Sequence, residues 1–279
     1  MRNLCYRWLA MVGGLSLVLV SAGCFKASTI MKVNQDGAGT IFESMAMREA
    51  TVQQIIGMMS GFAGAGKGPT VDEFMPLDQF KGKAGDYGPG VKYVKANKSR
   101  ENGFIKVEAE YSFSDVTKVK LPTSNQPDMP GSTNEGKPEY LAFGLVRNVR
   151  DGNSELTIRM PPPKPETTRG GTETDTQPQQ GEGDAEGGEA LLALFKDMEV
   201  TVAVECGKEV LSTNATNREG NRVTLLHFAF DKLLAHPEKL KELQKRSPKP
   251  ESLDAIKDLL KDIEGIKIEV QQEVKVKYQ

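Results

Sequence analysis

Alternating apolar and polar residues predict a series of short strands along the chain. The clearest case is the segment 104–113, where every second residue from Ile105 to Phe113 is apolar and Lys106, Glu108 and Glu110 lie between them. A strand with one face on a core and the other in water has this two-residue period. The same period, with Gly- and Asn-containing turns between the arms, predicts strands around Ile30 and Lys32 and at 40–45, 91–95, 140–149, 155–160, 200–206 and 223–230.

A different spacing predicts helices. Val52, Ile55, Ile56 and Met59 follow an i, i+3, i+4, i+7 pattern, which places them on one face of a helix. Further helices are expected at 71–83, 191–195, 231–245 and from an N-cap at Ser252 to Gly265. Together these elements predict an α+β protein, in which antiparallel β-hairpins form one or more sheets and helices pack on one face.

The thirteen residues 266–278 predict one long strand. Apolar side chains from Ile266 to Tyr278 share one face, and only Gln272 breaks the pattern. So long an amphipathic strand needs an edge partner and a layer over its apolar face. The C-terminal segment alone offers little of either. We therefore expect the two halves of the chain to build one shared core, or two tightly packed cores.

Residues 161–189 differ in composition from the segments on either side. They are rich in Gly, Pro, Thr, Gln and Glu and almost lack apolar side chains, which is typical of a disordered linker. The predicted organisation is a signal peptide at 1–23, an N-terminal α+β region at 24–160, this linker, and a C-terminal α+β region at 190–279.

The first residues have the pattern of an export signal. Arg2 and Arg7 precede an apolar run from Leu9 to Val20, which is followed by Ser21-Ala22-Gly23-Cys24. A basic start, a short apolar run and small residues describe a signal peptide, and the run is too short to span a bilayer as a helix.

The end of this signal resembles the bacterial lipobox, in which the cysteine after the cleavage site receives a diacylglycerol. The resemblance implies lipidation of Cys24, membrane attachment through that lipid, and a place in the cell envelope. Because Phe25 and not Asp follows Cys24, it further implies an outer membrane, with the protein facing the periplasm or the surface. The alternative is cleavage after Val20-Ser21-Ala22, which would release a soluble periplasmic or secreted protein.

Composition narrows the possible functions. The net charge is −2 and no basic block occurs, which argues against nucleic-acid binding. Residues 61–68 nearly spell a nucleotide-binding P-loop, but Gly68 replaces the hydroxyl residue and a helix precedes the glycines, so no nucleotide site is predicted. With two histidines in the chain and no metal-binding spacing, neither a metal nor another cofactor is expected.

Two residues remain as candidates for catalysis. Counting back from His227 across the turn at 219–221 places it opposite residues 212–214, which makes Ser212 a candidate nucleophile. Cys206 would be the only cysteine left beside Cys24 after cleavage, although its place on an apolar strand face favours a buried side chain. The N-terminal methionines favour core packing, with an apolar ligand pocket as the alternative.

The segment from Lys32 to Thr40, which follows the lipobox and precedes a helix, resembles the opening of LppM-type and related bacterial lipoproteins. The stretch from Val210 to Leu226, with Asn214-Ala215 before a Gly-Asn turn, is similar to a hairpin in them. The resemblance implies a small envelope domain without a catalytic centre, and it carries over no functional residue besides Cys24.

Two functions are consistent with these patterns. The first is a non-enzymatic, lipid-anchored envelope protein that binds a partner protein or an apolar ligand. The alternative is a secreted or anchored hydrolase-like enzyme that uses Cys206 or His227.

Overall fold

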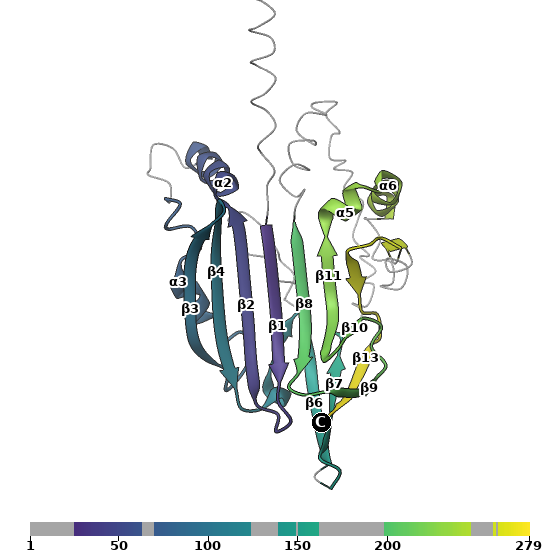
Figure 1. Cartoon of the computed structure of the whole chain (residues 1–279). Coiled ribbons are helices and arrows are strands. Elements are labelled where there is room, and N and C mark those ends of the chain that lie inside the picture. The colour runs from purple at the N-terminus through teal and green to yellow at the C-terminus, as the bar shows by residue number, and fades with distance from the viewer. Residues whose placement is uncertain are drawn as a thin grey trace, which may run out of the picture.

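The computed structural model describes residues 25–62, 70–123, 139–148, 150–161, 198–246, 259–260 and 262–279. The predicted signal peptide, Cys24, all but the first residue of the predicted linker and the predicted helix at 191–195 lie outside these residues. Within them, strands predominate and form two sheets (Figure 1).

The large sheet has eight strands among the described residues. Its order is β10-β11-β8-β1-β2-β4-β3, with β12 paired to β11. Its strands are β1 (Phe25–Val33), β2 (Gly39–Arg48), β3 (Lys92–Glu101), β4 (Phe104–Phe113), β8 (Glu199–Cys206), β10 (Arg218–Glu219), β11 (Arg222–Ala229) and β12 (Ile266–Ile268).

The small sheet has five strands in the order β5-β6-β7-β13-β9, again counting the described residues. Its strands are β5 (Leu121–Pro122), β6 (Tyr140–Asn148), β7 (Asn153–Arg159), β9 (Val210–Thr213) and β13 (Glu273–Tyr278). The last strand of the chain therefore pairs with β7, which precedes the predicted linker.

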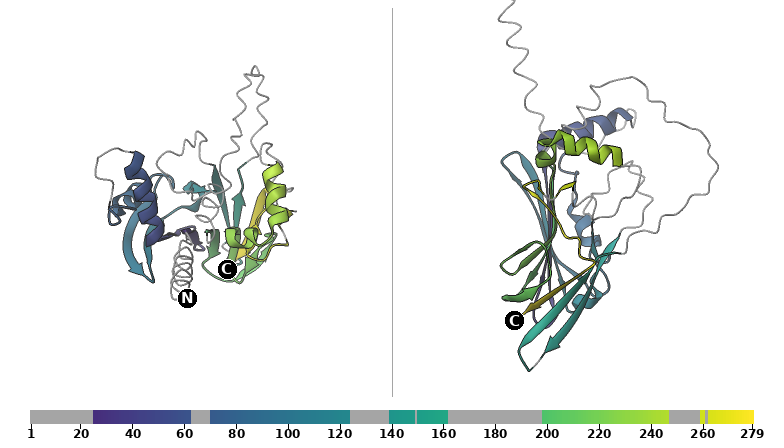
Figure 2. Two further views of the ribbon diagram at one scale, coloured as in Figure 1. Left: turned by 90° about the horizontal axis from the view of Figure 1, so that it is seen from above. Right: turned by 90° about the vertical axis from the view of Figure 1, so that its right-hand side faces the viewer.

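Most of the helical residues lie at one end of the large sheet. The helices α2 (Glu49–Phe62), α5 (Phe230–Leu234) and α6 (Pro237–Arg246) lie near the end where β1 begins (Figures 1 and 2). The short helix α3 (Leu77–Gly82) packs beside β3 with Phe80 buried, and a 3-10 turn, η1 (Val116–Lys118), follows β4.

The predicted α+β class is therefore wrong, because the chain is mostly β. The inward face of the large sheet is covered chiefly by the small sheet, and one core cluster joins Met31, Ile41 and Tyr111 of the first to Leu156 and Val276 of the second. The prediction assigned that cover to helices. Amphipathic periodicity shows that a strand has an apolar face but does not show which element covers it.

The prediction of a shared core is confirmed. β1 pairs with β8 in parallel over eight residue pairs, from Lys26 opposite Glu199 to Val33 opposite Cys206. Because these strands come from opposite sides of the predicted linker, the large sheet is complete only when both halves of the chain contribute. Sequence reasoning expected only antiparallel hairpins, and this parallel pair was missed.

The predicted long final strand is also wrong. The chain leaves the large sheet after β12, turns at Glu269 and enters the small sheet as β13. The Glu269 side chain is 4% exposed, and its carboxylate accepts hydrogen bonds from the backbone amides of Thr216, Val270 and Gln271. A buried carboxylate with these donors stabilises the bend, so the apolar positions on either side of it serve different sheets.

The last strand is also tied to the first hairpin. The Tyr278 ring is fully buried, and its hydroxyl donates a hydrogen bond of 3.0 Å to the backbone oxygen of Asn34 in the β1–β2 turn. In the same turn, the backbone oxygen of Gln35 accepts a bond of 3.0 Å from the Ser154 hydroxyl of β7. These bonds fix the two sheets against each other at the end opposite the start of β1.

We predict that Tyr278→Phe lowers the free energy of unfolding by about 1 kcal/mol, because it removes one buried hydrogen bond and keeps the ring. Urea denaturation measures the change. Lys277→Ala, at the exposed neighbouring position, is the control and is expected to have a smaller effect. Equal effects of the two substitutions would contradict a bond that couples the sheets.

Candidate functional site

His227 does not face the serine that the sequence suggested. It lies on β11 opposite Thr201 of β8, and the Thr201 hydroxyl is 3.0 Å from His227 Nδ1. Ser212 is in β9 of the small sheet, where it pairs with Lys277. The Ser-His hypothesis was wrong because β10, which follows the turn, pairs with β11 over only two residues. Beyond it, Lys267 of β12 lies opposite His227 on that edge, while β9 pairs with β13 in the other sheet.

Cys206 is a core residue. It is fully buried, and burial raises the pKa of its thiol to about 12, while the charge of Arg218 offsets part of this shift. Cys206 lies on the inward face of β8 with Val202 and Val204, whereas Thr201 and His227 lie on the other face. The two candidate catalytic residues therefore have no common site.

Other parts of the N-terminal region have structural roles. In the β1–β2 turn, Asp36 Oδ1 accepts a bond of 3.0 Å from the Ala38 amide. Met31, Met45, Met47 and Met75 are buried in the main core. The P-loop-like glycines after α2 lie outside the described residues, and within those residues no group of three or more His, Cys, Asp or Glu could hold a metal ion.

A buried acidic residue that the sequence analysis missed lies at the centre of the large sheet. Glu43 of β2 is 2% exposed, and its Oε1 is 2.5 Å from Lys83 Nζ. Its Oε2 accepts a hydrogen bond of 3.0 Å from the Tyr87 hydroxyl. The Tyr111 hydroxyl lies 3.4 Å from the same oxygen and donates to the backbone oxygen of Phe80 at 2.8 Å.

The polar cluster of Glu43, Lys83, Tyr87 and Tyr111 joins α3 and the loop after it to the sheet. Burial, followed by the nearby Glu43 charge, raises the pKa of both tyrosines well above the ordinary value. Both carboxylate oxygens have partners inside the protein, so the arrangement satisfies a buried charge. In the sequence, this cluster could have been suspected from Glu43, a charged residue at an inward position of an alternating strand.

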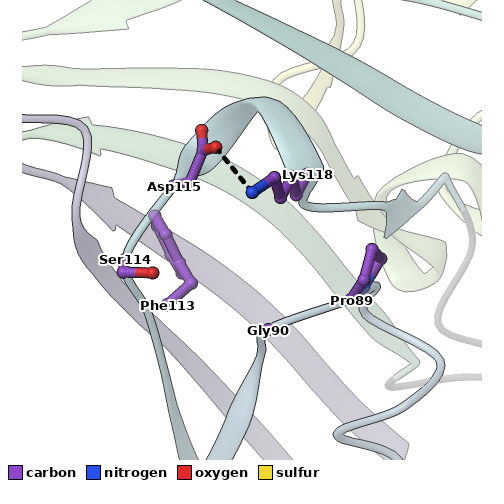
Figure 3. Close-up of a pocket in the computed structure, with 6 residues that line it drawn as sticks. All are labelled: Pro89, Gly90, Phe113, Ser114, Asp115 and Lys118. Atoms are coloured by element: carbon purple, nitrogen blue, oxygen red, sulfur yellow. Dashed lines mark ion pairs between the residues drawn. The ribbon is translucent and has the colours of Figure 1, made fainter.

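A surface pocket opens at the end of β4. It has a volume of about 340 Å³ and is lined by Pro89, Gly90, Phe113, Ser114, Asp115 and Lys118 (Figure 3). The Asp115 carboxylate caps η1, since it accepts bonds from the Thr117 amide and hydroxyl, which lower its pKa. Its other oxygen lies 3.4 Å from Lys118 Nζ, so an ion pair borders an otherwise largely apolar hollow.

The backbone beside this pocket is closely packed. Gly88 has a φ of +111°, and a Cβ atom there would lie 2.3 Å from the backbone oxygen of Lys118. The Lys120 amide also donates a hydrogen bond of 2.8 Å to the backbone oxygen of Tyr87. The loop before β3 is thereby held against the segment after β4, and the pocket is preformed.

A second pocket lies at the opposite end of the large sheet. Its volume is about 430 Å³, and charged residues from β1, β2, β8 and α5 line it together with Phe104 and His227. Lys26 forms an ion pair of 3.0 Å with Glu199, and the Arg48 guanidinium lies 5.0 Å from the centre of the Phe104 ring. Among the described residues, His227 has its hydrogen bond to the Thr201 hydroxyl and not to a carboxylate that could orient it as a catalytic base.

We predict that Lys83→Met lowers the free energy of unfolding by about 1–3 kcal/mol, because the buried Glu43 charge loses its counter-charge. Urea denaturation near neutral pH measures this effect. Lys81→Met changes an exposed lysine in the last turn of α3, two residues before Lys83, and is expected to leave stability nearly unchanged. Equal effects from both substitutions would contradict the role assigned to Lys83.

We predict that the Cys206 thiol does not react with a thiol reagent at pH 8 until the protein unfolds. Its folded pKa of about 12 exceeds the usual value of about 8.5, so the unfolded thiol ionises first. Its contribution to stability is thus complete below about pH 8.5 and is lost as the pH rises towards 12. Mass measurement of the peptide that contains Cys206 gives the labelled fraction, and rapid labelling of folded protein would contradict burial.

Comparisons with known proteins add one distant likeness. No protein-family model matches the chain, and no curated protein matches its sequence. Among solved structures, the folded domain of LppM from Mycobacterium tuberculosis is similar at 16% sequence identity, over 74% of this chain and 84% of that domain, with a TM-score of 0.28. A TM-score this low does not establish a common fold. Within the described residues, no helix has the length and apolar character to cross a membrane.

Proposed function

We propose that this chain is an exported bacterial lipoprotein, anchored through Cys24, that acts in the cell envelope by binding and not by catalysis. The observation that carries the proposal is the start of β1 at Phe25, the residue directly after Cys24. A diacylglycerol on Cys24 would therefore hold the large sheet at the bilayer with no intervening linker. Phe25 in place of Asp favours an outer membrane, as the lipobox resemblance implies.

The proposed binding site is the pocket lined by Phe113. In the strand register, Phe113 is opposite Gly39, and Gly39 is opposite Val33 at the far end of β1. The nine residues of β1 span eight steps of about 3.3 Å, so about 26 Å separates its two ends. An anchored protein would thus present this pocket away from the membrane, where an apolar or aromatic group of a partner protein or small ligand can enter it.

The placement of the two candidate catalytic residues supports a role in binding. Cys206 is buried in the core, and His227 lies on the opposite sheet face beside Thr201. A hydrolase that uses either residue would need an accessible nucleophile with an adjacent base. The Cys206 thiol is inaccessible, and among the described residues His227 has a hydrogen bond to the Thr201 hydroxyl but none to a carboxylate that would orient its ring.

The test is the intact mass of protein extracted from membranes of a bacterial host that processes lipoproteins. We predict a chain that begins at Cys24 with a mass increment of a diacylglyceryl group, and an additional species if an apolar ligand remains bound. Cys24→Ala should move the protein from the detergent phase to the aqueous phase, whereas Cys206→Ala, the control, should not. A wild-type chain that begins at Gly23 and partitions into water would overturn the anchor.

A further inference from the structure

The proposed anchor directly precedes β1, and a helical segment follows a strand of the large sheet on either side of it. Phe25 is opposite Met47 in the β1–β2 register, and α2 begins two residues after Met47. On the other side of β1, Lys26 is opposite Glu199, which is itself opposite Ala229, the last residue before α5. Figures 1 and 2 show α2 and α6 at this same end of the molecule.

The helix α2 is nearly uncharged. Glu49 is the only charged residue among its fourteen, and no basic residue occurs in its last turn. Its first turn is fixed to the sheet, since Val52 is fully buried and the Glu49 amide donates a bond of 2.9 Å to the Gly103 oxygen. Gln54 and Gly57, three residues apart on one face, are exposed.

The helix α6, in contrast to α2, is basic. It has four basic and two acidic residues among its ten, and Lys241 is exposed. Its apolar side chains Leu240 and Leu243 pack on a second core cluster with Leu233 and Ile263. The charged face of α6 is therefore turned away from that cluster.

We infer that this end of the molecule is a membrane-docking surface for a bilayer that contains anionic phospholipids. The inference rests on the proposed anchor at Cys24, which would bring α2 and α6 to the bilayer together. Ile55 and Ile56 pack against the main core, so the uncharged exposed face of α2 would lie among the lipid headgroups, next to the acyl chains. At fourteen residues α2 is about 21 Å long and too short to span. The basic α6 would contact anionic headgroups.

The experiment uses the full chain, processed in the host and reconstituted into vesicles of phosphatidylcholine and phosphatidylglycerol with brominated acyl chains. Trp8 is the only tryptophan of the sequence and leaves with the predicted signal peptide, so the processed chain has none. Gly57→Trp places a reporter on α2, where an added Cβ meets no atom within 4 Å. Val146→Trp replaces a residue that is 68% exposed on β6, in the hairpin distant from α2 (Figure 1), and is the matched control.

Bromolipid is expected to quench the Gly57→Trp emission by about half or more and to leave Val146→Trp nearly unquenched, because only the first lies at the bilayer. Gln54→Trp, on the same exposed face of α2, repeats the test if Gly57→Trp disturbs folding. Equal quenching at α2 and β6 would overturn the docking surface. If α2 binds a protein and not the bilayer, neither reporter is quenched, and this outcome also overturns it.

A charge-reversal pair tests α6. Lys239→Glu with Lys241→Glu should reduce the quenching of Gly57→Trp by about half on anionic vesicles, because anionic headgroups no longer attract α6. The control, Lys92→Glu with Lys95→Glu on β3, should leave it unchanged, and equal effects would overturn the role of α6. Intact mass separates the two proposals: protein without diacylglyceryl overturns the anchor and this inference with it, whereas lipidated protein without quenching overturns only the inference.

Discussion

The parallel pairing of β1 with β8 is the contact on which the rest of the structure depends. β1 lies in the interior of the large sheet, and without β8 one of its edges would present unpaired backbone groups. The pairing also brings β11 and β12 into the same sheet, and it positions the chain so that β13 can reach β7. Long-range backbone pairing and one shared core thus hold together segments that lie far apart in the sequence.

The sequence predicted single strands better than their assembly. The alternation from Ile105 to Phe113 located β4 to the residue, because side-chain period depends only on local geometry. The alternation from Ile266 to Tyr278 suggested one strand where there are two, because strands of different sheets can each keep their own apolar face. Sheet membership is decided by partners distant in sequence, and Glu269 marked the change only as one charged residue in an apolar run.

Site prediction failed for a related reason. Cys206 was correctly expected to be buried, since its strand face is apolar throughout. His227 was placed against the wrong strand. The turn at 219–221 shows that the chain reverses direction, but it does not show which strands pair with β11 at His227. The cluster at Glu43 needed knowledge of Lys83 and Tyr87, which lie forty or more residues away. Cys24 lies outside the described residues, and its lipidation stays a prediction.

The position of β1 has a mechanical consequence. β1 is hydrogen-bonded on both sides, to β2 along nine residue pairs and to β8 along eight. A pulling force transmitted through a lipid on Cys24 would act along the strand axis, so it would load both ladders in shear. Backbone bonds loaded this way share the force and must break together, whereas an edge strand peeled from its end loses them one at a time. An anchor at this position would therefore let the fold resist mechanical unfolding when the lipid is pulled.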